Sequence, residues 1–368
     1  MADINYRFRT ACPTLPILMT ATDDSLTNAA HESVAIDGGP VQLIDGFGRT
    51  HRSLRISVTD RCNIRCFYCM PAENVSFLPK QQILSFEEIH RLVALLATVG
   101  IQNLRLTGGE PLVRKDLPQL VQQLVAIPGI EDVALTTNGI LLSEQASALR
   151  AAGLQRLNIS LDTLREATFE KISRRQGLDR VLAGIDAALE AEFQEVRLNA
   201  LAIRGIVEEE AVALVEFAAA RNLTLRFIEF MPLDAERGWD AGQVLAGDDL
   251  LRLLEPTFGN ATPVGRRTAA QPATDYLFPA GQRVGLIRPV TKPFCGQCDR
   301  LRLTAEGALR NCLFSQQEWS LRAGLRSGQS DVQILRTVRE CLAAKQAGHL
   351  IQQPGFQQPQ RAMYQIGG

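Results

Sequence analysis

Hydrophobic and polar residues follow two alternating periods along residues 44–246. Short apolar or alternating runs, such as residues 54–58, predict β-strands. Between these runs apolar residues recur at helical spacing, and Ser85 with Glu88 has the form of a capping box that begins a helix running to about residue 99. The pattern predicts strands at 54–58, 103–106, 133–135, 156–160, 196–201 and 224–230.

The order of these elements indicates an α/β fold. A helix is expected between the third and fourth strands, and the other helices are expected at 117–126, 164–173, 178–192 and 208–220. Six strand–helix units in a row predict a parallel sheet that curves toward a barrel, and fewer than eight units leave such a barrel incomplete. The polar motifs described below follow the predicted strands, where barrels of this kind place their chemistry.

The two ends of the chain differ from this repeating part. Residues 1–43 show no sustained periodicity and predict a flexible extension rather than a targeting peptide, because acidic residues are interspersed among the basic ones. After about residue 247 a helical stretch gives way to a Gly-, Pro- and Ala-rich segment and then a strand at 283–287. We therefore expect three parts: an extension at 1–43, a partial barrel at 44–246 and a smaller C-terminal domain at 247–368.

Three cysteines directly follow the first predicted strand. Cys62, Cys66 and Cys69 have the spacing C-x3-C-x2-C on one loop. Thiolates are preferred ligands of iron in iron–sulfur clusters, and three of them on a four-iron cluster leave one iron open to a substrate or cofactor. Structural zinc and buried free cysteines are the alternatives, although zinc sites usually draw on two separated ligand pairs.

A second group of cysteines lies in the C-terminal part. Cys295, Cys298 and Cys312 again offer three thiolates, which favours a second cluster with an open iron; zinc completed by Asp299 or a distant histidine is the alternative. Such clustering is a metal-binding pattern rather than a disulfide pattern, and it indicates a reducing compartment.

Arginines interrupt the predicted strands. Arg55, Arg105 and Arg197 stand in otherwise apolar runs, where a buried charge needs a partner. Guanidinium groups suit bidentate phosphate contacts, so a cavity rimmed by these residues and by Arg300 and Arg302 predicts a nucleoside triphosphate site.

The overall charge limits the range of partners. The 368 residues include 39 basic and 40 acidic ones, for a net charge of −1, so the chain has no general field that would favour nucleic acid or an anionic membrane. Since no apolar run reaches the length of a membrane span and no signal peptide is visible, we expect a cytoplasmic protein.

The cysteine loop, with an aromatic residue before its last cysteine, resembles the signature of the radical S-adenosylmethionine (SAM) enzymes. The resemblance implies that the SAM amino and carboxylate groups chelate the open iron, and that an electron from the cluster cleaves SAM to a 5′-deoxyadenosyl radical. It implies cofactor-binding roles for Tyr68, Gly108, Gly109, Glu110, Ser160 and Met231.

The whole motif set, from Asp45 through the cysteine groups to Gly367-Gly368, resembles the GTP 3′,8-cyclase family. This resemblance implies two 4Fe–4S clusters, the auxiliary one on Cys295, Cys298 and Cys312. It implies conversion of GTP to (8S)-3′,8-cyclo-7,8-dihydroguanosine 5′-triphosphate, the first step of molybdenum cofactor biosynthesis. The GTP-site positions would be Arg55, Arg105, Thr136, Arg197, Arg300 and Arg302; the family commonly has Lys where Arg197 stands.

The same resemblance implies an external electron donor, a homodimer, a C-terminal tail that reaches into the active site, and handover of the product to cyclic pyranopterin monophosphate synthase. A radical SAM peptide-modifying enzyme with an auxiliary cluster is the nearest alternative enzyme. An iron–sulfur electron carrier or a zinc-binding interaction protein is the alternative from another class, and it would not bind SAM.

Overall fold

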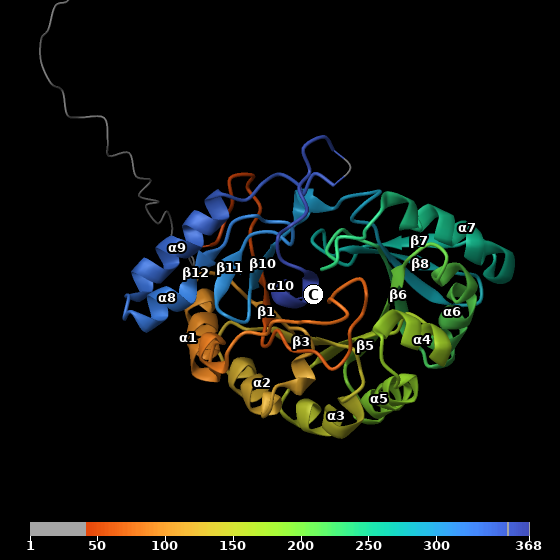
Figure 1. The fold of residues 1–368 in the computed structure, drawn as a ribbon, viewed down its shortest axis with the longest axis horizontal. Coiled ribbons are helices and arrows are strands. Elements are labelled where there is room, and N and C mark those ends of the chain that lie inside the picture. The colour runs from red at the N-terminus through yellow and green to blue at the C-terminus, as the bar shows by residue number, and fades with distance from the viewer. Residues whose placement is uncertain (1–41, 352, 368) are drawn as a thin grey trace, which may run out of the picture. The chain divides into compact units, whose positions relative to one another are not determined.

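Six parallel strands form the centre of the molecule. The computed structural model describes residues 42–351 and 353–367. Within them β1 to β6 lie side by side in chain order, each pair parallel. The sheet curves, as Figure 1 shows, and so confirms the predicted incomplete (βα)6 barrel. The strands are β1 (Ser53–Ser57), β2 (Asn103–Thr107), β3 (Asp132–Thr137), β4 (Arg156–Ser160), β5 (Glu195–Ala202) and β6 (Thr224–Glu229).

The helices that connect these strands cover the outer face of the curved sheet (Figure 1). The first begins at the predicted capping box, in which Ser85 and Glu88 each bond the backbone of the other. Each helix buries an apolar stripe against the strands, which continue the same hydrophobic core. They are α1 (Phe86–Ala97), α2 (Leu117–Val125), α3 (Leu142–Ala151), α4 (Glu166–Ser173), α5 (Leu178–Glu190) and α6 (Ala211–Ala220).

The C-terminal residues extend the same sheet at both edges. β9 (Arg283–Ile287) pairs in parallel with β6, and β10 (Arg300–Leu303) pairs in parallel with β1. Antiparallel strands continue outward on each side, in the order β12-β11-β10-β1 and β6-β9-β8-β7. The remaining elements are α7 (Gly247–Phe258), β7 (Thr262–Gly265), β8 (Ala273–Leu277), β11 (Ala308–Arg310), β12 (Trp319–Ser320), α8 (Leu321–Arg326), α9 (Asp331–Ala343) and α10 (Met363–Ile366).

The predicted domain boundaries remain predictions. Hydrogen-bonded strands run across the expected border near residue 246, so the C-terminal part shares a sheet with the barrel. Residues 1–41 of the expected extension lie outside the described residues. Leu43, at its end, is buried, and its carbonyl oxygen accepts a hydrogen bond from the His51 N–H. None of the helices in the described part of the chain is long and apolar enough to cross a membrane.

The end of the chain lies inside the curve of the sheet. Figure 1 shows α10 surrounded by the strands. Gly367 has a φ of +85°, and a Cβ at this position would lie 2.7 Å from Thr107 Oγ1 and 2.9 Å from Ser57 Cβ. Only glycine fits here, because both the backbone conformation and the space exclude a side chain. The predicted Gly-Gly tail therefore packs against β1 and β2 with its first glycine; Gly368 lies outside the described residues.

Candidate active site

A cavity of about 1210 Å³ opens inside the curved sheet. All six residues expected to bind SAM line it, as do Cys62, Cys66 and Cys69. Of the six expected GTP residues, Arg55, Arg105, Thr136, Arg197 and Arg300 line it as well. The structure therefore brings the cysteine loop and the predicted nucleotide site to one space.

The cysteine loop is held in place by hydrogen bonds within its own backbone and to the end of α4. The Arg65 amide donates to Ser173 O at 2.8 Å, and the Phe67 amide donates to Ile172 O at 3.1 Å. The amides of Cys69 and Met70 both donate to the Cys66 carbonyl oxygen at 2.9 Å. The Arg65 guanidinium donates to the Cys62 carbonyl oxygen at 2.8 Å, and Asn138 Nδ2 lies 3.7 Å from the Cys62 sulfur. The loop thus holds three thiols in fixed positions at the edge of the cavity.

The chemistry of these thiols fits an iron–sulfur cluster. Burial, and next the charge of Glu110, raises the pKa of Cys62 to about 11, and burial also raises the pKa values of Cys66 and Cys69. Buried thiols of this kind become thiolates on binding metal and release protons. Within the described residues no three His, Cys, Asp or Glu side chains converge to hold a single metal ion. Thiolates that bind different irons of one cluster do not need to converge on one point.

Gly108 and Gly109 pack the end of β2 against the start of the cysteine loop. A Cβ on Gly108 would lie 2.6 Å from the Thr59 carbonyl oxygen, and one on Gly109 would overlap the Arg61 carbonyl. The Gly109 amide donates to Thr59 O at 2.7 Å and the Glu110 amide to Arg61 O at 2.8 Å. The two glycines are therefore needed for the close approach of these two backbone segments.

Glu110 is a buried carboxyl group at the cavity wall. It accepts hydrogen bonds from Thr137 Oγ1 at 2.6 Å, Asn138 N at 2.7 Å and Leu112 N at 3.0 Å. Burial outweighs these bonds and raises its pKa to about 7. The carboxyl is thus held in a fixed orientation beside the cysteine loop, where it can meet a cation such as an ammonium group.

Tyr68 is fixed by Asp162, a residue that the sequence reading missed. The Tyr68 hydroxyl donates to Asp162 Oδ2 at 2.7 Å, and the Leu201 amide donates to Asp162 Oδ1 at 2.8 Å. Asp162 follows β4, two residues beyond Ser160, and it also lines the cavity. This pair links the cysteine loop to strands β4 and β5.

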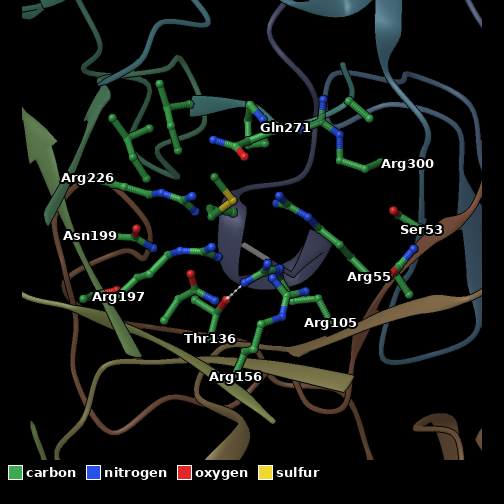
Figure 2. Close-up of a pocket in the computed structure, with 18 of the residues that line it drawn as sticks. Ser53, Arg55, Arg105, Thr136, Arg156, Arg197, Asn199, Arg226, Gln271 and Arg300 are labelled. Atoms are coloured by element: carbon green, nitrogen blue, oxygen red, sulfur yellow. Dashed lines mark hydrogen bonds between the residues drawn. The ribbon is translucent and has the colours of Figure 1, made fainter. Parts of the chain in front are cut away.

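The arginines lie in rows across the sheet. Arg55 on β1 stands directly opposite Arg105 on β2 and also opposite Arg302 on β10. Like charges at opposed positions repel each other, and this arrangement is unfavourable unless an anion lies among them. Figure 2 shows the guanidinium groups of Arg55, Arg105, Arg197 and Arg226 pointing from different strands toward one space.

Burial first, and neighbouring positive charges next, lower the pKa values of these arginines. Burial, and after it the charges of Arg55 and three further arginines, holds the pKa of Arg105 well below its usual range. Burial lowers the pKa of Arg55 to about 10, with Arg300 as the next cause, and lowers that of Arg197 to about 10, with Arg226 as the next. Arg105 bonds Thr136 Oγ1 at 3.4 Å, which provides no negative charge. A polyanion would relieve this excess of positive charge.

Arg226 and Arg156 were not predicted as site residues, yet both line the cavity. Arg226 interrupts an apolar strand, the signal that had selected the other three arginines, and so it could have been found. Gly285 makes room for it, because a Cβ there would lie 2.9 Å from Arg226 Cγ. Three buried polar atoms in the cavity wall lack a hydrogen-bond partner in the structure: Asn158 Nδ2, Asn199 Oδ1 and Arg226 Nε.

The second cysteine group lies beside the cavity. Cys295, Cys298 and Cys312 do not line it, although Gly296 and Gln297 do. Burial alone would raise the pKa of Cys298, but the cations of Arg300 and Lys345 lower it to about 7. Burial raises the pKa of Cys295, and the nearby charges of Cys312 and Cys298 act in the same direction. Their predicted role remains a prediction.

Arg302 occupies a different place from the other predicted GTP residues. It is buried outside the cavity lining, and its guanidinium donates to the Gly367 carbonyl oxygen. Arg302 thus holds the C-terminal tail in this structure, and its predicted contact with GTP remains a prediction.

Fold and family comparisons define the class of protein. A family model described as "Radical SAM superfamily" matches residues 56–218, and one described as "Molybdenum Cofactor Synthesis C" matches residues 223–351. The solved structure of Streptococcus suis SuiB bound to S-adenosylmethionine aligns with 74% of this chain and 64% of that chain at 15% identity, with a TM-score of 0.51. The fold and the cysteine loop are those of a radical SAM protein.

Curated relatives specify the family. The chain is 55% identical to the GTP 3′,8-cyclase of Rhodopirellula baltica over 89% of this chain and 93% of that protein. It is 44% identical to the GTP 3′,8-cyclase of Streptomyces coelicolor, over 89% and 96% of the two chains. The chain therefore belongs to the GTP 3′,8-cyclase family, and the predicted recognition is confirmed.

Proposed function

We propose that this protein converts GTP to (8S)-3′,8-cyclo-7,8-dihydroguanosine 5′-triphosphate, the first step of molybdenum cofactor biosynthesis. The observation that carries the proposal is the row of opposed arginines, with Arg55 facing Arg105, in a cavity that also contains the radical SAM cysteine loop. A peptide substrate does not call for so many converging guanidinium groups, whereas a triphosphate does.

Cys62, Cys66 and Cys69 would hold a 4Fe–4S cluster, and Cys295, Cys298 and Cys312 a second one. Bound there with SAM, the first cluster would supply radical chemistry, namely a 5′-deoxyadenosyl radical able to take hydrogen from C3′ of GTP. The fit of the second group is supported by the nearness of Cys312 and Cys298 to Cys295, whose pKa their charges help to raise, and by Gly296 and Gln297, which extend the same loop into the cavity.

The chain's own residues bind and orient the two small molecules. Glu110 would accept the methionyl ammonium of SAM, while Ser160 and Met231, at the ends of β4 and β6, would contact its carboxylate and adenosyl parts. Arg55, Arg105 and Arg197 would hold the triphosphate, joined by Arg226. Such positioning supplies much of the effect of an enzyme whose cofactors perform the bond-breaking step.

The cavity also has a means of excluding water. Met363 of α10 lines it, and the tail is held by Arg302 at Gly367 and by the Met363 amide, which donates to Leu233 O at 3.0 Å. A closed cavity protects a radical from side reactions. We propose that the tail helps to close the site when GTP is bound.

The proposal also includes partners, which follow from membership of the family and not from the fold. The enzyme would take electrons from an external donor, act as a homodimer in the cytoplasm and pass its product to cyclic pyranopterin monophosphate synthase. Each of these remains a prediction from the resemblance.

A direct assay tests the proposal. Anaerobically reconstituted protein with reductant and SAM, with and without GTP, is analysed by mass spectrometry for 5′-deoxyadenosine and for an isomer of GTP. Formation of both only when GTP is present supports the proposal. Deoxyadenosine without a GTP isomer would retain the radical SAM class and reject GTP as the substrate.

A further inference from the structure

Lys345 is a buried cation beside the auxiliary cysteines that no part of the proposed reaction uses. It follows α9, and 5% of its surface is exposed. Its Nζ donates to Asn311 O at 2.6 Å and to Arg300 O at 3.0 Å, and lies 3.8 Å from the Cys298 sulfur. These acceptors adjoin two separate ligand positions, since Asn311 precedes Cys312 and Arg300 lies two residues after Cys298.

The segment 345–349 is fastened across the same cysteines by Arg49. The Arg49 guanidinium donates to Cys295 O at 2.9 Å, to Gln346 O at 2.9 Å and to Ala347 O at 3.1 Å. Asp45 holds Arg49 in turn, at 2.7 Å. Arg49 therefore holds the residues directly after Lys345 beside Cys295.

The charge of Lys345 has no carboxylate to balance it among its hydrogen-bond partners. Its acceptors are two backbone carbonyl oxygens and one sulfur. A buried ammonium with neutral partners is costly unless an anion is close by. The thiolate of Cys298 in an iron–sulfur cluster is such an anion, and charges or hydrogen bonds at cluster sulfurs are among the factors that set reduction potential.

We propose that Lys345 raises the reduction potential of the auxiliary cluster, with its ammonium group close to the Cys298 thiolate. This inference rests on the proposed second cluster. A nearby positive charge stabilises the more negative, reduced form, so the cluster accepts an electron more readily. A purely structural lysine would tie the two cysteine segments together without altering the potential.

The test uses the full-length chain with Cys62, Cys66 and Cys69 replaced by alanine, so that the remaining signal belongs to the auxiliary cluster. In this background Lys345→Met removes the charge, Lys345→Arg retains it, and Arg339→Met, which removes an exposed charge from the preceding helix α9, is the control. Iron content, electron paramagnetic resonance spectra and midpoint potentials are measured on each. Absence of iron from the background protein itself would reject the second cluster and, with it, the proposed function's account of these cysteines.

With iron present, we expect Lys345→Met to shift the midpoint potential to more negative values, while Lys345→Arg and Arg339→Met stay close to the background protein. Loss of iron in Lys345→Met alone would also overturn the inference, because the charge would then be needed to hold the cluster rather than to set its potential. An unchanged potential in Lys345→Met would overturn the inference, and so would equal loss of iron from Lys345→Met and Lys345→Arg, because the latter keeps the charge.

Discussion

Arg55 and Arg105 lie directly opposite each other on adjacent parallel strands, both facing the same cavity. Two facing guanidinium groups destabilise a folded protein, and burial together with the charge of Arg55 holds the pKa of Arg105 well below its usual range. This repulsion between buried arginines occurs in the cavity that the cysteine loop also lines. Such a local concentration of positive charge in a chain of net charge −1 indicates a polyanionic ligand.

Replacing Arg105 with methionine should change GTP affinity and the stability of the fold in opposite directions. We expect the Kd for GTP to rise about ten- to a hundredfold, since a charge-assisted hydrogen bond contributes roughly 1.5–3 kcal/mol. The melting temperature should stay equal or rise, because the repulsion with Arg55 is relieved. Equilibrium dialysis and thermal unfolding measure the two effects. Arg252→Met, at an exposed position on α7, is the matched control, and equal GTP affinity in both variants would contradict the account.

Variants of Arg197 can show whether GTP binding depends on the positive charge at this position or on the shape of the guanidinium group. Its side chain is 7% exposed and forms an ion pair with Glu195. We expect Arg197→Lys to keep GTP binding within about threefold, because the charge remains and one bidentate contact weakens. Arg197→Met should weaken binding about tenfold or more. If both variants bound GTP as the unmodified protein does, Arg197 would have no part in the triphosphate site.

Glu110 predicts a pH dependence of SAM binding. Its pKa of about 7 in the folded protein means that the carboxylate forms only as the pH rises through 7. We expect SAM affinity to fall below pH 7 and to become nearly independent of pH in Glu110→Gln, where it is weaker at pH 8. Dialysis against SAM from pH 5.5 to 8.5 measures this. A pH-dependent profile that persists unchanged in Glu110→Gln would assign the titration to another group.

The same shift has a consequence for stability. Because the pKa of Glu110 is raised from 4.5 to about 7, the unfolded chain releases this proton first as the pH rises. The contribution of Glu110 to the free energy of unfolding therefore falls as the pH rises from about 4.5 to about 7 and stays low above that pH. Glu110→Gln removes this pH dependence. Denaturant unfolding at pH 5 and pH 8 should show a smaller loss of stability in the variant than in the unmodified protein.

Gly109→Ala should disturb the cysteine loop. The added methyl group would overlap the Arg61 carbonyl, so the backbone at Thr59 to Arg61 must move. We expect reconstituted iron to fall by about half, corresponding to one of two clusters. Gly46→Ala is the control, because a Cβ at Gly46 meets nothing within 4 Å and the position is outside both cysteine groups. Full iron content in Gly109→Ala would show that the close approach is not needed for cluster assembly.

The sequence predicted the repeating part of the fold well. Periodicity and the Ser85 capping box indicated the six parallel strands and the start of α1, because each is a local property of the chain. The strand positions of Arg55, Arg105 and Arg197 likewise led to the prediction that they rim one cavity. Pairing of β9 with β6 and of β10 with β1 depends on contacts between distant segments, which no local pattern encodes.

The site was predicted less completely. Arg226 carried the same signal as the other strand arginines and was missed, whereas Asp162 and Lys345 had no signal in the sequence. Their roles arise only from three-dimensional neighbours: the Tyr68 hydroxyl for Asp162 and the Cys298 sulfur for Lys345. The bond of Arg302 to Gly367 has the same origin, since it joins residues 65 positions apart.

The most direct test of the central claim follows one hydrogen atom. Reconstituted protein is incubated anaerobically with reductant, SAM and GTP that carries deuterium at C3′, and the 5′-deoxyadenosine is analysed by mass spectrometry. The account predicts deoxyadenosine that contains one deuterium, together with the cyclised GTP isomer. Unlabelled deoxyadenosine, formed at the same rate with and without GTP, would contradict it.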